Sequence, residues 1–112
     1  MVERVEVGPS TAHLRTAVPP DLRFFEGHFD GDPVLPGIAE LLLLVHRRAR
    51  ELWGELGRER RITRLKFEQA IRPGDALDIH LDRSATDEET VVRFRIERGG
   101  QACATGAIAY AR

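Results

Sequence analysis

The C-terminal half of the chain alternates apolar and polar residues with a period of two. In "ALDIHLD" (residues 76–82) three apolar residues fall on one face and three polar residues on the other. "TVVRFRIE" (residues 90–97) alternates in the same way. In "TRLKFEQAI" the apolar residues Leu65, Phe67 and Ile71 are expected to share a face. This period is typical of strands that bury one face and expose the other.

Further strands complete this picture. Gly99-Gly100 predicts a tight hairpin, and "QACATGAIAYA" (residues 101–111) is expected to be the closing strand. At the other end of the chain, "VERVEV" (residues 2–7) and "TAHLRTAV" (residues 11–18) predict two extended segments. The Pro19-Pro20-Asp21 sequence ends the second of them.

One helix is predicted between the two groups of strands, from Ile38 to about Trp53. Its first half is apolar on all sides apart from Glu40, which is the pattern of a buried helix. The basic stretch that follows, "HRRARELWGELGRERR", is predicted to emerge into solvent. Three or four consecutive antiparallel strands after one buried helix predict an α+β fold, in which a sheet with one apolar and one wet face wraps the helix.

Composition restricts the class of protein. The chain has 112 residues, which predicts a single domain over residues 1–112, and its net charge of −1 argues against a general nucleic-acid binder. The longest apolar run is too short to span a membrane, and the N-terminus lacks the apolar core of a signal peptide. A lone cysteine, Cys103, suits the reducing cytoplasm and is predicted to be a small core residue.

Candidate chemistry concentrates in "GHFDGDPVLPGIAELLLLV", residues 27–45. His28 carries an imidazole, which gains and loses a proton near neutral pH. Gly37 lies where a helix can begin, and the first N–H groups of a helix lack internal partners. Glu40 is the only ionisable group on the first turns of that helix. It is either a working partner of His28 or an acid stabilised by the helix dipole.

Three stretches of the sequence resemble the 3-hydroxyacyl-(acyl carrier protein) dehydratases of fatty-acid synthesis. "FFEGHFDGDPVLPG" resembles their signature, "LKFEQAIRPGDAL" their strand–turn–strand unit, and "ERGGQACATGAIAY" their last hairpin. The resemblance covers about residues 11–110. The short length and the "LPGIAEL" helix start look closest to the dehydratase-like domains of aryl-polyene biosynthesis.

The resemblance implies a hotdog fold, a long central helix wrapped by an antiparallel sheet, in a homodimer or higher homo-oligomer. It implies an active site at the dimer interface and a substrate held as a phosphopantetheine thioester, on acyl carrier protein or coenzyme A, with no resident cofactor or metal. By motif position His28 would remove the α-proton, the Gly37 N–H would polarise the thioester carbonyl, and a carboxylate would help the hydroxyl leave. The product would be a trans-2-enoyl thioester.

The sequence departs from the family at the carboxylate. In the family that residue stands fourteen positions after the histidine, where this chain has Leu42. Glu40 comes two residues earlier, a rotation of about 200° on a helix. Three readings follow: the helix begins differently and Glu40 enters the site, His46 one turn beyond Leu42 supplies the acid, or the second group is absent.

Those readings leave several functions open. Besides dehydration, the sequence is compatible with a non-catalytic subunit that binds acyl thioesters and with a thioesterase, since one fold hosts all three. His13 and His80 have polar neighbours and are predicted to be solvated. A set of arginines either forms a solvated face or docks an acidic carrier protein. Its members are Arg47, Arg48, Arg50, Arg58, Arg60 and Arg61.

Overall fold

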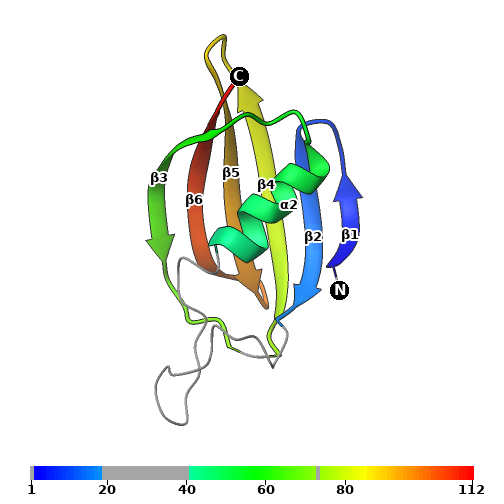
Figure 1. The fold of residues 1–112 in the computed structure, drawn as a ribbon. Helices are drawn as coiled ribbons and strands as arrows, with labels where there is room; N and C mark the ends of the chain where they lie inside the picture. Colours follow the sequence, from blue (N-terminus) through cyan, green and yellow to red (C-terminus); the bar gives the residue numbers. More distant parts are fainter. Residues whose placement is uncertain (1, 19–40, 73) are drawn as a thin grey trace.

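The protein folds into one antiparallel sheet with a helix across one face (Figure 1). The computed structural model describes residues 2–18, 41–72 and 74–112. The strands are β1 (Val2–Val7), β2 (Thr11–Ala17), β3 (Glu59–Phe67), β4 (Ala76–Ala85), β5 (Glu89–Arg98) and β6 (Gln101–Ala111). Their order in the sheet is β1-β2-β4-β5-β6-β3, so β1 and β3 form its two edges. The predicted α+β class is confirmed.

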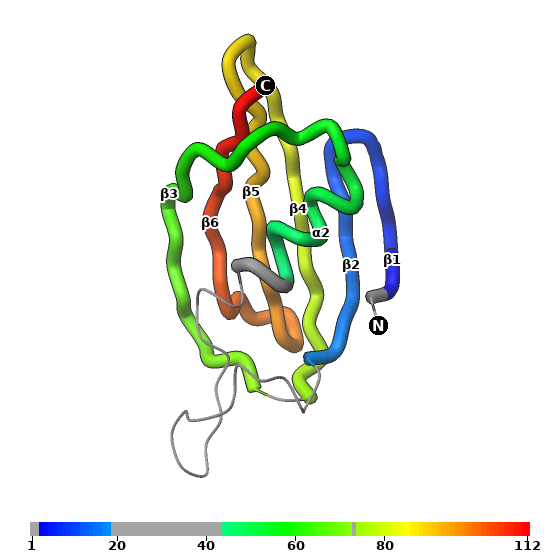
Figure 2. The backbone as a smooth tube through the Cα atoms, viewed as in Figure 1, coloured from blue at the N-terminus to red at the C-terminus, as the bar shows by residue number. Residues whose placement is uncertain are grey.

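The helix lies over the middle of the sheet (Figure 2). A π-helical segment (Leu41–His46) leads directly into α2 (Arg47–Leu52), and the chain leaves helical geometry at Trp53. The predicted C-terminal end is therefore confirmed. The predicted start at Ile38 lies outside the described residues, so the length of a long central helix stays a prediction. Within the described ranges no helix is long and apolar enough to cross a bilayer.

The basic stretch continues past the end of the helix into the sheet. Its last residues, from Glu59 onward, belong to β3, where they are exposed as predicted. The break comes at Trp53, which is buried, and Gly57 lets the chain pass close to the end of β6, because an added Cβ there would overlap the carbonyl of Ala111. Ala111 donates its N–H to the carbonyl of Arg58 at 2.8 Å, which anchors the start of β3.

The core lies between the helix and the inner face of the sheet. The predicted alternation is confirmed in β4 and β5, whose inward apolar residues are all buried: Leu77, Ile79, Leu81, Val92, Phe94 and Ile96. From the helix, Leu44, Val45 and Ala49 pack against them. Each large apolar side chain that is fully buried contributes about 1.5–3 kcal/mol. Cys103 is fully buried in β6, as predicted for a small core residue.

The edge strand β3 does not follow the predicted pattern. Leu65 and Phe67 are 43% and 47% exposed, whereas Ile71, beyond the end of the strand, is completely buried. The three residues therefore do not share a face. A register shift between Thr63 and Lys66 and a left-handed backbone at Arg64 (φ 54°) interrupt the alternation.

The Gly99-Gly100 hairpin is confirmed. Both glycines have positive φ, 59° and 82°, which glycine adopts without the steric cost that a side chain brings. They join β5 to β6. β6 carries the C-terminal residues, which lie beside the helix. The connection between β4 and β5 is short, because β4 continues to Ala85 and β5 begins at Glu89.

Candidate functional site

Four polar side chains join the helix to the two strands at the β3 edge, and we call them the helix–edge cluster. They are His46, Arg50, Glu59 and Tyr110. The ring of His46 lies parallel to that of Tyr110, with 5.9 Å between the ring centroids and 13° between the planes. His46 Nδ1 lies 3.1 Å from the Tyr110 hydroxyl, and His46 Nε2 lies 2.5 Å from Glu59 Oε1. Helix, β6 and β3 therefore meet at one imidazole.

The hydroxyl of Tyr110 stays protonated beside His46. Tyr110 is fully buried, and burial raises its pKa to about 12, so the phenol keeps its proton at neutral pH. Its hydroxyl lies within hydrogen-bond distance of His46 Nδ1, and the carboxylate of Glu59 lies beside His46 Nε2. Both ring nitrogens of His46 are occupied.

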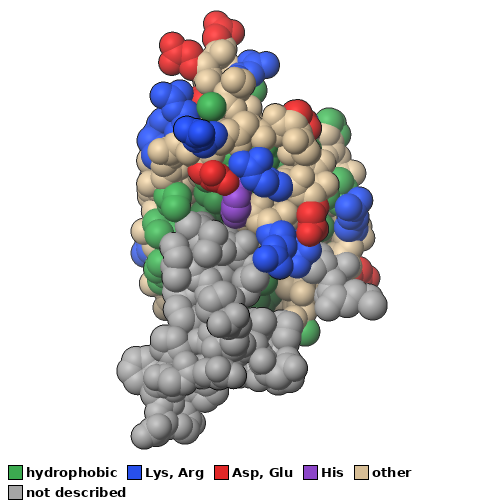
Figure 3. All heavy atoms as spheres, viewed as in Figure 1, with side chains coloured by type: hydrophobic (Ala, Val, Ile, Leu, Met, Phe, Trp, Pro, Cys, Tyr) green, Lys and Arg blue, Asp and Glu red, His purple; other side chains and the backbone are tan. Residues whose placement is uncertain are grey.

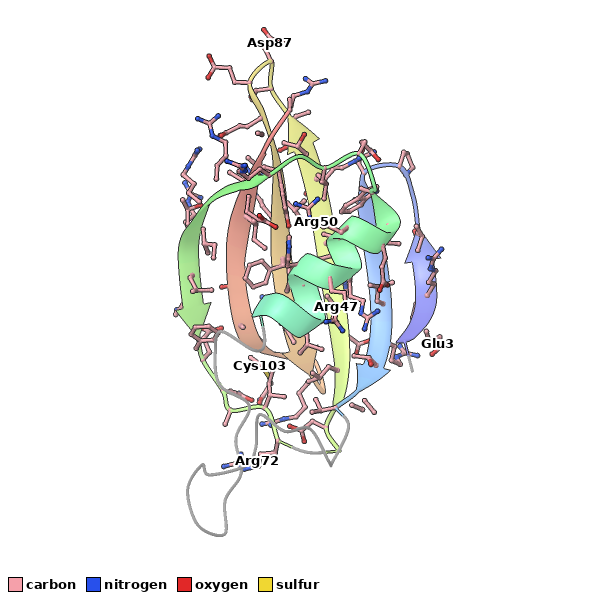
Figure 4. The ribbon with its side chains drawn as sticks, viewed as in Figure 1. Glu3, Arg47, Arg50, Arg72, Asp87 and Cys103 are labelled. Atoms are coloured by element: carbon pink, nitrogen blue, oxygen red, sulfur yellow. The ribbon has the colours of Figure 1, made fainter. Side chains whose placement is uncertain are left out.

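Arg50 completes the cluster by holding Glu59 as an anion. Figure 4 shows Arg50 projecting from α2, and its guanidinium lies 5.6 Å from the centre of the Tyr110 ring. It donates to the carbonyls of Leu56 and Gly57, at 2.9 and 2.7 Å, and to Glu59 at 3.1 Å. A hydrogen bond from the backbone of Glu59 itself, followed by that from Arg50, holds the pKa of Glu59 below its usual value.

The titration of Tyr110 provides a direct test of this arrangement. Tyr110 is the only tyrosine in the chain, so the phenolate absorbance reports this residue alone. We expect a midpoint near pH 12 in the folded protein and near 10 in denaturant. Because the unfolded state ionises first, the free energy of unfolding should fall by about 2–3 kcal/mol as the pH rises from 10 to 12. Tyr110→Phe should flatten this slope, and a folded midpoint near 10 would contradict the buried hydroxyl.

The residues singled out for catalysis lie outside the part of the chain that the structure describes. His28, Gly37 and Glu40 all belong to residues 19–40, so their roles stay predictions. The chain enters the described helix at Leu41, directly after this motif. The three residues therefore precede the same helix that carries His46 and Arg50.

The helix–edge cluster bears on one of the three readings of the missing carboxylate. In that reading His46 supplies the acid in place of a residue at position 42. A group that acts as a general acid must reach the substrate with a transferable proton. Nε2 of His46 lies against the carboxylate of Glu59, and its Nδ1 faces Tyr110, so both ring nitrogens are engaged within the protein. The geometry therefore favours a linking role for His46, between the helix and β3.

Sequence reasoning missed Tyr110 and Glu59, which lie 64 and 13 positions from His46. Neither the helical nor the strand period connects residues that far apart. A weak signal was present, however, because a tyrosine inside the apolar strand "GAIAYA" must find a partner for its hydroxyl when buried. A histidine on the helix is a suitable partner when one of its ring nitrogens is available for a hydrogen bond.

The other two described histidines form a pair on the outer face of the sheet. His13 and His80 are direct neighbours across β2 and β4, and their rings stack with centroids 4.3 Å apart. Each ring is bonded to a carboxylate through Nε2, His13 to Asp78 at 2.7 Å and His80 to Glu97 at 2.9 Å. Their side chains are 27% and 42% exposed, so the predicted solvation is confirmed in part, and cross-strand carboxylates hold both rings as well. Within the described ranges no cluster of three or more such ligands could hold a metal ion.

The arginines considered for carrier docking are mostly engaged. Arg48 binds Glu51, and Arg60 and Arg61 both lie against Glu89, at 3.8 and 2.5 Å. Together with Arg50, four of the six therefore have carboxylate partners. Arg47 and Arg58 are exposed, and no carboxylate of residues 2–18, 41–72 or 74–112 lies within ion-pair distance of either. Figure 3 shows basic and acidic side chains interleaved over this face, as these pairs require.

Comparison with known proteins finds a match over almost the whole chain. The model of the ApeI-like family, described as ApeI dehydratase, matches residues 4–107. A 3-hydroxyacyl-[acyl-carrier-protein] dehydratase FabZ of Pediococcus pentosaceus is 32% identical over 87 residues, which is 72% of this chain and 58% of the relative. The FabZ of Alkaliphilus metalliredigens is 33% identical over 91 residues, 76% of this chain and 60% of the relative. The chain thus spans about three fifths of the length of these relatives.

The solved structures show the fold. The dehydratase heterocomplex ApeI:P from Xenorhabdus doucetiae superposes with a TM-score of 0.81 and 24% identity, covering 98% of this chain and 95% of that one. This likeness confirms the predicted hotdog architecture of a sheet wrapped around a helix. At this level of identity it concerns the fold alone.

Proposed function

The chain belongs to the ApeI-like family, and from this premise we propose that it dehydrates 3-hydroxyacyl thioesters to trans-2-enoyl thioesters in fatty-acid or polyketide-like biosynthesis. The observation that carries the proposal is the family match over residues 4–107, which includes the whole His28 motif. The dehydratase names of the FabZ relatives support the same reaction class.

In the proposed reaction His28 acts as the base that removes the α-proton of the substrate. The electron pair left on the α-carbon delocalises onto the thioester oxygen, where the Gly37 N–H at the start of the helix would stabilise the developing charge. The enolate then re-forms its carbonyl as the bond to the 3-hydroxyl breaks. Glu40 would donate the proton that lets this hydroxyl leave as water. No metal, redox cofactor or covalent intermediate is needed for this sequence of steps.

We propose that two hotdog subunits associate along β3 to complete the site. The family resemblance places catalytic groups from two subunits at one interface. Within the described sheet, β3 is paired on one side only, with β6. Its residues from Glu59 to Phe67 are all exposed. The second subunit is either another copy of this chain, as the sequence led us to expect, or a related chain.

We further propose that the acyl group arrives as a phosphopantetheine thioester, on acyl carrier protein in preference to coenzyme A. The printed names of the FabZ relatives specify a carrier protein. Carrier proteins of this kind are acidic, and clustered opposite charge steers such encounters. Arg47 and Arg58 are the members of the arginine set that are available for this contact.

One assay separates the proposed function from its alternatives. The chain is incubated with a 3-hydroxyacyl carrier-protein thioester and, in parallel, with the coenzyme A thioester, and the products are analysed by mass. Loss of one water with the thioester intact supports dehydration. Release of free thiol identifies a thioesterase, and binding without turnover identifies a non-catalytic acyl-binding subunit.

Glu40→Gln tests the identity of the acid. The substitution keeps the shape of the side chain but removes the transferable proton, so we expect kcat to fall about 100-fold with a small change in KM. Leu42→Glu, which restores a carboxylate at the position that the family uses, serves as the comparison. If Leu42→Glu raises kcat while Glu40→Gln leaves it unchanged, position 42 faces the substrate and Glu40 does not.

A further inference from the structure

Arg64 occupies an unusual position in β3. Of the described non-glycine residues it alone has a positive φ, 54°. A register shift in the pairing with β6 lies between Thr63 and Lys66. Arg64 and Leu65 therefore stand together opposite a single residue, Gly106. This two-against-one arrangement is a β-bulge, and bulges at sheet edges often redirect a side chain beside a functional site.

The side chain of Arg64 is not what its backbone favours. A left-handed backbone brings the Cβ of an L-residue too close to the following carbonyl oxygen, and glycine avoids this conflict. A long charged side chain at such a position therefore lowers the stability of the fold. Strained positions of this kind concentrate where a protein binds or clamps a ligand. The surroundings of the guanidinium indicate which ligand that is.

Arg64 is the cation of β3 that lacks a described anion. The other cations of the strand have carboxylate partners within ion-pair distance: Arg60, Arg61 and Lys66. Arg64 is exposed, and no carboxylate of residues 2–18, 41–72 or 74–112 lies within that distance of it. A guanidinium presents its N–H donors as a rigid planar fork, which matches the oxygens of a carboxylate or a phosphate.

Resting on the proposed function, in which two subunits meet along β3 and the substrate is a phosphopantetheine thioester, we propose that Arg64 binds the phosphate of the phosphopantetheine arm. This phosphate occurs in carrier-protein thioesters and in coenzyme A thioesters, so the same contact serves both. Arg64 then determines specificity for the arm and takes no part in proton transfer.

The neighbours of Arg64 fit such an arm. Ile62, Leu65 and Phe67 are 44%, 43% and 47% exposed, and Figure 3 shows apolar side chains along the side of the molecule where β3 lies. The pantetheine arm is uncharged apart from its phosphate and carries apolar methyl groups. One unpaired cation beside exposed apolar side chains matches that composition. An acidic protein surface would instead need several unpaired cations.

Arg64→Gly separates the strain of the backbone from the contact of the side chain. Glycine removes the steric conflict, so at equal protein concentration the variant should unfold about 3–5 °C above wild type. Glycine also removes the guanidinium, so KM for a 3-hydroxyacyl phosphopantetheine thioester should rise about 10-fold while kcat stays unchanged. Higher stability together with weaker substrate binding is the result expected when strain is retained for binding.

The control substrate is the same acyl thioester on pantetheine, which has no phosphate. Its KM should be equal for wild type and Arg64→Gly, whereas carrier-protein and coenzyme A thioesters should both show the rise in KM. A rise with the carrier protein alone would show that Arg64 contacts the surface of the carrier. An equal rise with pantetheine would show that the substitution disturbs the bulge. Either result, or an unchanged KM with all substrates, overturns the inference.

Arg64→Lys and Arg4→Gln are the matched variants. Lysine keeps the charge and the strain, so this chain should retain part of the affinity for the phosphate without any gain in stability. Arg4 is an exposed cation on β1, at the opposite edge of the sheet. Its substitution should leave KM unchanged. If Arg4→Gln raises KM as much as Arg64→Gly does, the protein attracts the phosphate by its overall charge and the contact at Arg64 is overturned.

Binding measured without turnover separates this inference from the proposed function. An S-alkyl phosphopantetheine, a thioether that cannot be dehydrated, is titrated by calorimetry into wild type and Arg64→Gly. Weaker binding to the variant supports the contact even if the chain dehydrates no substrate, a result that would overturn the proposed function only. Dehydration by both chains with equal Kd and KM overturns the contact only. Absence of binding to wild type also overturns it.

Discussion

Replacing His28 by alanine should lower kcat for dehydration about 1,000-fold. The proposed base removes a weakly acidic α-proton, and removing a positioned base typically costs 100- to 10,000-fold. Substrate binding should change little, since the imidazole acts on the reacting atoms rather than on the carrier arm. The rate is measured with a 3-hydroxyacyl carrier-protein thioester, by following the absorbance of the conjugated enoyl product.

His80→Ala is the matched control for that measurement. His80 lies on the outer face of the sheet, bound to Glu97 and stacked on His13, on the side away from the helix. It should retain nearly full activity. A His28→Ala chain that keeps more than a tenth of the wild-type rate, with a normal Tyr110 titration, would show that another group is the base.

Much of the fold could be predicted because its strands carry a local signal. β4 and β5 alternate strictly, so each residue's face follows from its neighbours, and burial of Leu77 and Ile79 beside exposed Asp82 is what that pattern requires. β3 carried a similar pattern but behaves differently. Among the described strands β3 pairs with β6 alone, and a local pattern cannot show that a strand lies at the edge of a sheet.

The candidate site was less predictable than the fold, because its contacts are long-range. His46 was recognised from its position on the helix, but its partners come from β3 and from the end of β6. The link to Tyr110 joins residues 64 positions apart, and it depends on how far the helix rotates over the sheet. That rotation is set by the packing of the core and leaves no local pattern in the sequence. The sequence could therefore place a histidine on the helix, but it could not show that both ring nitrogens have partners.

Gly57→Ala should be the most damaging small substitution in the described part of the chain. A Cβ at Gly57 would overlap the carbonyl of Ala111, which is backbone and has no room to rotate away. We expect the free energy of unfolding to fall by about 3 kcal/mol or more, the upper range for overpacking. Gly54→Ala, three residues earlier, is the control, because its added Cβ would have only the Arg50 carbonyl, at 4.0 Å, as a neighbour. Urea denaturation of both variants measures the difference.

The position of Gly57 makes this substitution a test of the site as well as of stability. Its carbonyl accepts from Arg50, the residue that also holds Glu59, and Gly57 lies two residues before Glu59 at the start of β3. Displacing this turn should therefore shift Arg50 and Glu59 and reduce the burial of Tyr110. The phenol of the variant, titrated where it is still folded, should then ionise below the wild-type midpoint. A destabilised variant with an unchanged Tyr110 midpoint would show that the helix–edge cluster does not depend on this turn.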